Sequence, residues 1–176
     1  MSDPRRVAVR NHYHSPRFRL DEETFALAEG DCVVRPVVHH PGAVAIVAQP
    51  SPQRLVLVRQ YRYPIQAWTL EIPAGTRESG EEPLATAQRE LAEEAGLAAQ
   101  TWQELTRFYP AVGVSDEEMI LYRAQDLHPA MGDPDHGELV QVEEVACEDL
   151  PHLISRGNIC DAKTLMACAI LGVWPC

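Results

Sequence analysis

The stretch that most constrains the fold is GTRESGEEPLATAQRELAEEAGL, residues 75–97, because it carries the signals of one sharply delimited helix. Pro83 suits a first helical turn, where its missing N–H would have no partner anyway. Gly96 suits the position just past the last turn, where a left-handed backbone favours glycine. The apolar residues between them share one stripe at helical spacing: Leu84, Ala87, Leu91 and Ala95. The sequence therefore predicts a helix that points this stripe into the core.

Strands are predicted on both sides of this helix. Two apolar, β-branched runs at 42–48 and 55–61 flank a short turn that contains proline, which is typical of a β-hairpin. Further strands are expected at 67–75, 101–110, 118–127 and 139–146, and closing helices at 148–157 and 161–172, the last capped by Asp161. This order predicts an α+β fold with a mixed β-sheet sandwiched between helices. Residues 1–20 are mixed and basic, and fit either an edge strand or a loose arm.

Composition narrows the classes of partner. The 176 residues are enough for one compact domain, or one domain plus a small accessory piece, and their net charge of −11 disfavours nucleic acid as a partner. The same charge permits small phosphate compounds that arrive with a divalent metal. No apolar run could span a bilayer and the N-terminus lacks a signal-peptide core, so we expect no membrane partner and a cytoplasmic location. The five scattered cysteines favour neither a disulfide framework nor a structural zinc site.

The predicted helix crowds three carboxylates into one turn. At about 100° per residue, Glu90 and Glu94 share one face and Glu93 lies on its flank. Carboxylates grouped without sulfur or imidazole suit hard cations such as Mg²⁺ or Mn²⁺. The alternative is an ordinary solvated acidic face, because like-charge repulsion costs only about a few tenths of a kcal/mol per pair.

The residues before the helix favour the metal interpretation. The whole stretch resembles the Nudix box, G-x5-E-x7-R-E-U-x-E-E-x-G-U, where U is a bulky aliphatic residue. Every fixed position of this pattern is met: Gly75, Glu81, Arg89, Glu90, Leu91, Glu93, Glu94, Gly96 and Leu97. The resemblance implies the Nudix fold, over a catalytic domain at 51–176 with an N-terminal β segment at 1–50.

The resemblance also implies roles for individual residues. Glu90 and Glu94 should ligate the metal, and Glu93 should share in a second metal or orient a bound water. The carbonyl of Ala74 and Gly75 should form the loop edge beside the metal. Glu81 and Arg89 should pair with each other and position that loop against the helix.

Segments outside the box resemble the branch that contains ADP-ribose pyrophosphatases and nucleoside-diphosphate-sugar hydrolases. They are RQYRYPIQAWTLEIPAG (59–75), FYPAVGVSDEEMILYRAQDL (108–127) and HPGAVAIVA (40–48). This resemblance implies hydrolysis of ADP-ribose to AMP and ribose 5-phosphate with Mg²⁺ or Mn²⁺ as cofactor. The alternatives are another substrate, such as GDP-mannose, another sugar nucleotide or a diadenosine polyphosphate, and a non-catalytic sensor that binds ADP-ribose.

The branch suggests further candidates. Arg62 is expected to grip the diphosphate or the terminal ribose, because its planar fork matches phosphate oxygens. Glu71 could bond ribose hydroxyls or form an ion pair at the strand end. Glu138 is the first candidate for the general base, Glu117 and Glu118 are its rivals or could bind ribose, and Glu93 could take the base role itself. Members of the branch commonly exchange an N-terminal β segment, so residues 1–50 are expected to build a homodimer, or else to extend the sheet in cis.

Overall fold

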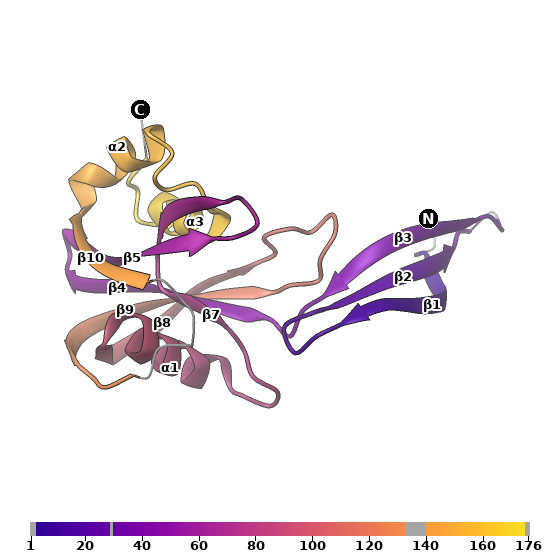
Figure 1. Cartoon of the computed structure of the whole chain (residues 1–176), viewed down its shortest axis with the longest axis horizontal. Helices are drawn as coiled ribbons and strands as arrows, with labels where there is room; N and C mark the ends of the chain where they lie inside the picture. Colours follow the sequence, from indigo (N-terminus) through magenta and orange to yellow (C-terminus); the bar gives the residue numbers. More distant parts are fainter. Residues whose placement is uncertain (1–2, 29, 133–139, 175–176) are drawn as a thin grey trace. The chain divides into compact units, whose positions relative to one another are not determined.

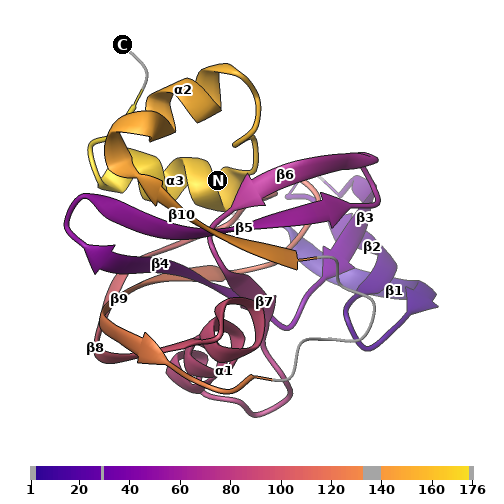
Figure 2. The ribbon, with the colours of Figure 1, turned by 60° about the vertical axis from the view of Figure 1, so that its left-hand side comes forward.

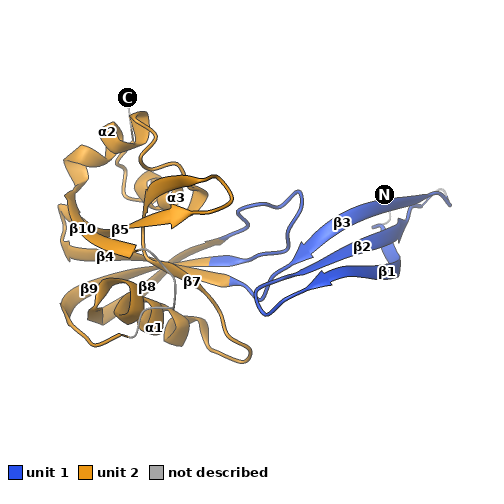
Figure 3. Ribbon diagram, viewed as in Figure 1, with its two compact units in different colours: residues 1–42, 108–119 blue, residues 43–107, 120–176 orange. Residues whose placement is uncertain are grey.

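The computed structural model of the chain describes residues 3–28, 30–132 and 140–174. It divides into two compact units, residues 1–42 with 108–119 and residues 43–107 with 120–176 (Figure 3). This division differs from the boundary predicted at residue 50. The difference arises because β4 (Ala43–Ser51) pairs with strands of the second unit rather than with the N-terminal segment.

The first unit is a three-stranded antiparallel sheet in the order β1 (Arg5–His14), β2 (Arg19–Ala26) and β3 (Cys32–His39). Residues 1–20 therefore contribute a full strand rather than a loose arm. The segment 111–116 is bound to the end of β3: Val38 N–H donates to the carbonyl of Val114 at 2.8 Å, and Asp116 N–H donates to the carbonyl of Val38 at 3.1 Å. These bonds make residues 108–119 part of this unit.

The second unit is built on a seven-stranded sheet with the strand order β10-β5-β4-β9-β8, in which β6 pairs with β5 and β7 pairs with β4. Its further elements are β5 (Arg54–Arg62), β6 (Ala67–Glu71), β7 (Ala74–Thr76), α1 (Pro83–Ala95), β8 (Leu97–Phe108), β9 (Met119–Pro129), β10 (Val140–Ala146), a 3-10 turn (Cys147–Asp149), α2 (Leu150–Ser155) and α3 (Ala162–Ile170). Helix α1 covers one side of the sheet, and α2 and α3 cover the other (Figures 1 and 2). The predicted α+β fold is confirmed.

The limits of α1 follow the predicted signals. Pro83 occupies the first turn, and Gly96 ends the helix in the left-handed region, with φ of 65°. Ala87 and Leu91 are fully buried against the sheet, as predicted. Leu84 was predicted to be core and this was wrong, because its side chain is 39% exposed. Near the start of the helix the polar residue Thr86 is buried instead, and its hydroxyl donates to Glu81 Oε2 at 2.8 Å.

The closing helix α3 begins where the sequence placed it. Asp161 caps it by accepting a hydrogen bond from Thr164 N–H at 3.1 Å. Its buried face carries polar as well as apolar side chains: Lys163, Thr164, Ala167 and Cys168. None of the helices within residues 3–28, 30–132 and 140–174 has the length and apolar character needed to cross a bilayer.

Candidate active site

The first component of the site is the short strand β7, which passes directly beneath α1. Gly75 lies so close to Glu90 that a Cβ on this residue would stand 1.9 Å from the Glu90 carboxyl carbon. No side chain fits at that separation, so the glycine is required for the carboxylate to occupy its place. Strand β7 is held in turn by β4, where Val44 pairs with Gly75.

The same piece of backbone also fixes Glu94. The N–H of Ala74 donates to Glu94 Oε2 at 2.9 Å. Glu90 and Glu94 therefore both point from α1 onto the Ala74–Gly75 backbone, one turn of helix apart. The sheet sets the position of the strand and the helix sets the position of the carboxylates, so the arrangement does not depend on a long loop.

Arg89 is the positive charge at the centre of the cluster. Its Nε donates to Glu81 Oε1 at 3.1 Å, and its Nη1 donates to Glu90 Oε1 and to Glu93 Oε2, both at 2.8 Å. The expected pair with Glu81 is present. The bonds to Glu90 and Glu93 were not predicted, although the i,i+4 spacing of Arg89 and Glu93 was a usable signal. Hydrogen bonding to Glu81 and the neighbouring carboxylates raise the pKa of Arg89.

Glu81 connects the loop after β7 to the helix. Its carboxylate accepts from Arg89, from Thr86 and from Glu78 N–H at 3.1 Å. The hydrogen bond from Arg89, with those from Glu78 and Thr86, outweighs the effect of burial and lowers the pKa of Glu81 to about 2. A second bond from Arg89 to the carbonyl of Thr76, at 3.3 Å, holds the other end of the loop.

A further component of the site is the ion pair between Arg62, at the end of β5, and Glu71, at the end of β6. Arg62 Nε and Nη2 donate to the two oxygens of Glu71 at 2.8 and 2.6 Å. The Glu71 side chain is 1% exposed, whereas that of Arg62 is 41% exposed. Of the two interpretations left open for Glu71, the ion pair is the one that the structure contains.

Glu71 has a second cationic partner, Lys163 on α3, which is also hydrogen bonded to it. Burial alone would raise the pKa of Glu71, but the bonds from Arg62 and Lys163 outweigh it and lower this pKa to about 2. Hydrogen bonding to Glu71 raises the pKa of Arg62, and the charges of Glu71, Glu94 and Asp161 raise it further. The exposed guanidinium therefore lies within the electrostatic reach of a carboxylate of the acidic cluster.

Gly132 is a site feature that the sequence did not reveal. A Cβ at this position would lie 2.0 Å from the carbonyl oxygen of Ala92 and 2.5 Å from the backbone nitrogen of Glu93. The chain that follows β9 is thus held against the turn of α1 that carries Glu93 and Glu94. A glycine is needed here because the backbone at Gly132 lies against the backbone of α1, which leaves no room for a side chain. The sequence could not predict this contact, because it does not show that residue 132 lies against α1.

The candidates for the general base are divided between the two units, and one of them lies outside the described residues. Glu117 and Glu118 belong to the first unit, where Glu117 N–H donates to Ser115 Oγ at 3.1 Å and the Glu117 carboxylate lies 3.9 Å from His40 Nδ1. Glu138 lies outside the described residues. The second unit supplies the remaining candidate, Glu93, which is bonded to Arg89.

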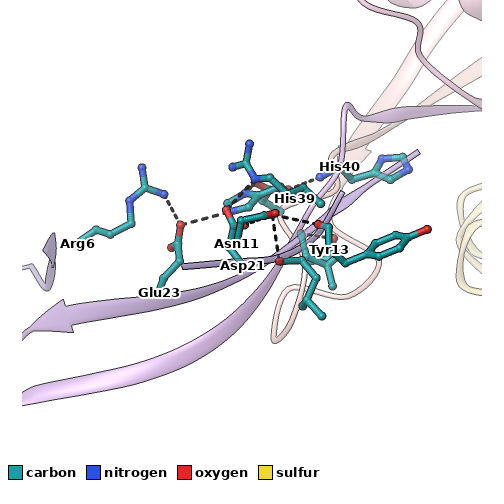
Figure 4. A network of polar contacts seen from close by, with 12 residues as sticks. Arg6, Asn11, Tyr13, Asp21, Glu23, His39 and His40 are labelled. Carbon is teal, nitrogen blue, oxygen red and sulfur yellow. Dashed lines mark hydrogen bonds and ion pairs between the residues drawn. The ribbon is translucent and has the colours of Figure 1, made fainter. Parts of the chain in front are cut away.

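A second group of acidic side chains lies on the sheet of the first unit, among several cationic and polar side chains (Figure 4). Asp21, Glu23 and His39 present ligand-type atoms within 4.8 Å of one another. However, Arg6 bonds Glu23 at 2.5 Å and Arg19 bonds Asp21 at 2.7 Å. The two carboxylates are compensated by two arginines, so this group is explained as an ion-pair network that joins the three strands.

Comparison with known proteins identifies the family. The model of the NUDIX domain matches residues 38–168, most of the chain. The chain belongs to the Nudix family. The segment 75–97 is its Nudix box, and the chain is a Nudix hydrolase.

Individual relatives of this Nudix chain agree with the family match. It is 39% identical to an ADP-ribose pyrophosphatase of Bacillus subtilis (strain 168) over 82% of the chain and 80% of the relative. It is 43% identical to an ADP-ribose pyrophosphatase of Mycobacterium tuberculosis (strain ATCC 25618 / H37Rv), over 62% of the chain and 54% of that relative. A solved structure of an ADP compounds hydrolase matches with a TM-score of 0.84 and 22% identity, covering 98% of this chain and 94% of that one. This last likeness confirms the Nudix fold.

The low pKa values of Glu71 and Glu81 predict acid sensitivity. Both lie near 2 in the folded protein, below the ordinary value of 4.5, so the ionised forms stabilise the fold at any pH above about 4.5. This contribution is lost as the pH falls from about 4.5 to about 2. We expect the free energy of unfolding, measured by urea denaturation, to decline over that range, and less steeply in Glu81→Gln. Glu82→Gln, at the exposed neighbour, is the control. An equal slope in Glu81→Gln would contradict the assignment.

Proposed function

We propose that this Nudix hydrolase cleaves the diphosphate of ADP-ribose to AMP and ribose 5-phosphate with Mg²⁺ or Mn²⁺. The observation that carries the proposal is the convergence of Glu90 and Glu94 on the Ala74–Gly75 backbone, within electrostatic reach of the exposed guanidinium of Arg62. The similarity to ADP-ribose pyrophosphatases over most of the chain supports the choice of substrate.

The donor set fits a hard divalent cation. Glu90 and Glu94, with the carbonyl of Ala74 and a contribution from Glu93, would hold it, and all of these donors are oxygens. The lack of a side chain at Gly75 leaves room for the Glu90 carboxylate to lie against the backbone, near the Ala74 carbonyl. When bound, the metal neutralises the diphosphate and lowers the pKa of the attacking water. Arg89 contributes by keeping Glu90 and Glu93 in fixed positions.

Arg62 is proposed to bind the anionic substrate. Its Nε and Nη2 edge is occupied by Glu71, which leaves Nη1 on the opposite edge of the guanidinium. A fixed, partly exposed guanidinium is suited to phosphate oxygens or to the terminal ribose. Glu71, which could have bonded ribose directly, is proposed instead to orient Arg62, because its own carboxylate is buried.

Glu138 is proposed as the general base that accepts a proton from the attacking water. The close contact of Gly132 with the Ala92–Glu93 backbone supports this assignment, because the segment that leads to Glu138 starts beside the acidic turn of α1. Glu117 and Glu118 are kept as alternatives for the base or for ribose binding, and Glu93 as a further alternative for the base.

A second copy of this chain is the proposed protein partner. The strands of the first unit carry exposed apolar side chains, including Val7, Val9, Tyr13 and Val34, which are between 45% and 52% exposed. Burying them against a partner would be favourable at about 25 cal/mol per Å². Their location on the N-terminal segment agrees with the dimerising role that the branch implies for it.

A panel of nucleoside diphosphate derivatives, assayed with Mg²⁺ or Mn²⁺ by phosphate release after phosphatase coupling, tests the function. We expect the highest kcat/KM with ADP-ribose. A higher value with GDP-mannose or a diadenosine polyphosphate would reassign the substrate within the family. Binding of ADP-ribose without turnover would make the protein a sensor.

Glu94→Gln is expected to lower kcat by orders of magnitude, because the amide removes a metal-binding charge. The change is nearly isosteric and the Ala74 N–H can still donate to the amide oxygen, so the melting temperature should stay close to that of the unmodified protein. Steady-state kinetics and thermal unfolding are the two measurements. Comparable activity in the variant would exclude Glu94 as a ligand.

Glu138→Gln is expected to lower kcat strongly while KM stays near normal, because a general base acts on the transition state rather than on substrate binding. The matched variant Glu117→Gln should retain most of the activity. If KM alone rises in Glu138→Gln, the residue is a binding contact, and a large kcat loss in Glu117→Gln instead would transfer the base role.

Light scattering is expected to give about twice the chain mass of 19.6 kDa. Val9→Asp should shift the protein toward the monomer, because a charge on the apolar strand must be desolvated on association. Val112→Asp, on an 80% exposed residue outside the strands, is the control and should leave the mass unchanged. A monomer in the unmodified protein would refute the proposed dimer.

A further inference from the structure

The chain contains a single lysine, and it is buried. Of its fifteen lysine and arginine residues, fourteen are arginine, and the exception is Lys163 on α3. This residue is 8% exposed. Because a lysine is almost never buried without a partner, its contacts must compensate its charge. The other fourteen positions carry arginine, whereas the position between the buried Glu71 carboxylate and the partly exposed Asp161 carboxylate carries a compact ammonium rather than a planar fork.

The ammonium of Lys163 connects two carboxylates from different elements. It donates to Glu71 Oε2 on β6, and to Asp161 Oδ1 at the start of α3 at 2.9 Å. The adjacent Thr164 ties the same two segments together, since its hydroxyl accepts from Ile72 N–H at 3.0 Å. The first turn of α3 is therefore hydrogen bonded to the chain at Glu71 and Ile72. Ile72 lies three residues before Gly75 of the Nudix box.

The charges of this group balance only when Lys163 is included. Arg62 and Lys163 are positive, and Glu71 and Asp161 are negative. Asp161 also attracts Arg62, as its effect on the pKa of that residue indicates. Without the lysine, Asp161 would keep the hydrogen bond from Thr164 N–H but lose its ion pair with Lys163. Its negative charge would then compete with Glu71 for the guanidinium and repel an anionic substrate.

We propose that Lys163 is a positioning residue for substrate binding: it anchors Glu71 and neutralises Asp161, so that Arg62 stays on Glu71 and presents its opposite edge to the diphosphate. This inference deepens the proposed function and rests on it for the identity of the ligand. Lys163 itself is not proposed to touch the substrate.

The kinetic test replaces the ammonium without shortening the side chain. Lys163→Met should raise KM for ADP-ribose by about tenfold or more and change kcat much less, because Arg62 grips the ground state as well as the transition state. The double variant D161N/K163M removes the competing negative charge and keeps a good helix cap, so it should recover most of the lost affinity. A role limited to folding would not be rescued in this way.

Cys168→Ala is the matched control, because Cys168 is fully buried on the same helix and lies outside the ion-pair group. It should lower the melting temperature and leave KM unchanged. If Lys163→Met shows a KM within about twofold of the unmodified protein, or if the double variant recovers nothing, the positioning role is wrong. If Lys163→Met does not fold, Lys163→Gln and D161N/K163Q take the places of the two variants.

A measurement without turnover separates this proposal from the proposed function. The ¹⁵N-bound Nε–H signal of Arg62, assigned by its loss in Arg62→Lys, should exchange slowly with water because it is bonded to Glu71. In Lys163→Met its exchange should be about tenfold faster or more, and an unchanged rate would overturn the proposal. If no member of the substrate panel is cleaved, the proposed function fails, and this exchange rate still decides whether Lys163 positions Arg62.

Discussion

The site depends on one electrostatic constraint: carboxylates that share a helical turn must be held by fixed positive charge. Arg89 meets this need within the chain, because its guanidinium bonds Glu81, Glu90 and Glu93 together. The sequence suggested that a bound cation relieves the repulsion. The structure adds that an arginine already relieves part of it, and that the Ala74 N–H donates to Glu94 on the same face of the helix.

Rigid elements enforce this arrangement from two sides. Strand β7 is paired to β4 and cannot move away from α1, while Leu91 and Ala87 anchor the helix in the core beneath the same sheet. Burying these side chains is worth roughly 25 cal/mol per Å² of apolar surface, which maintains the close backbone approach at Gly75. Stability and function are therefore linked through the packing of one helix.

Local signals explain what could be predicted from sequence. Proline and glycine mark the limits of α1, Asp161 marks the start of α3, and the spacing of the box residues brings Glu90 and Glu94 to one face. Contacts between distant residues could not be predicted in this way. Glu71 and Lys163 are 92 positions apart, and only the path of α3 across the sheet brings them together. The prediction for Leu84 was wrong for a related reason. Helical spacing defines which face of α1 is apolar, but not how far along the helix the sheet covers that face.

The composition of the chain has a practical corollary. Its one ε-amino group lies 8% exposed between two carboxylates, so reagents that acylate lysine side chains should react slowly with the folded protein. The rate of acylation at Lys163 should consequently report how often α3 separates from β6. Because the sequence contains one lysine, that signal would come from one known position, an outcome that lysine-rich enzymes do not allow.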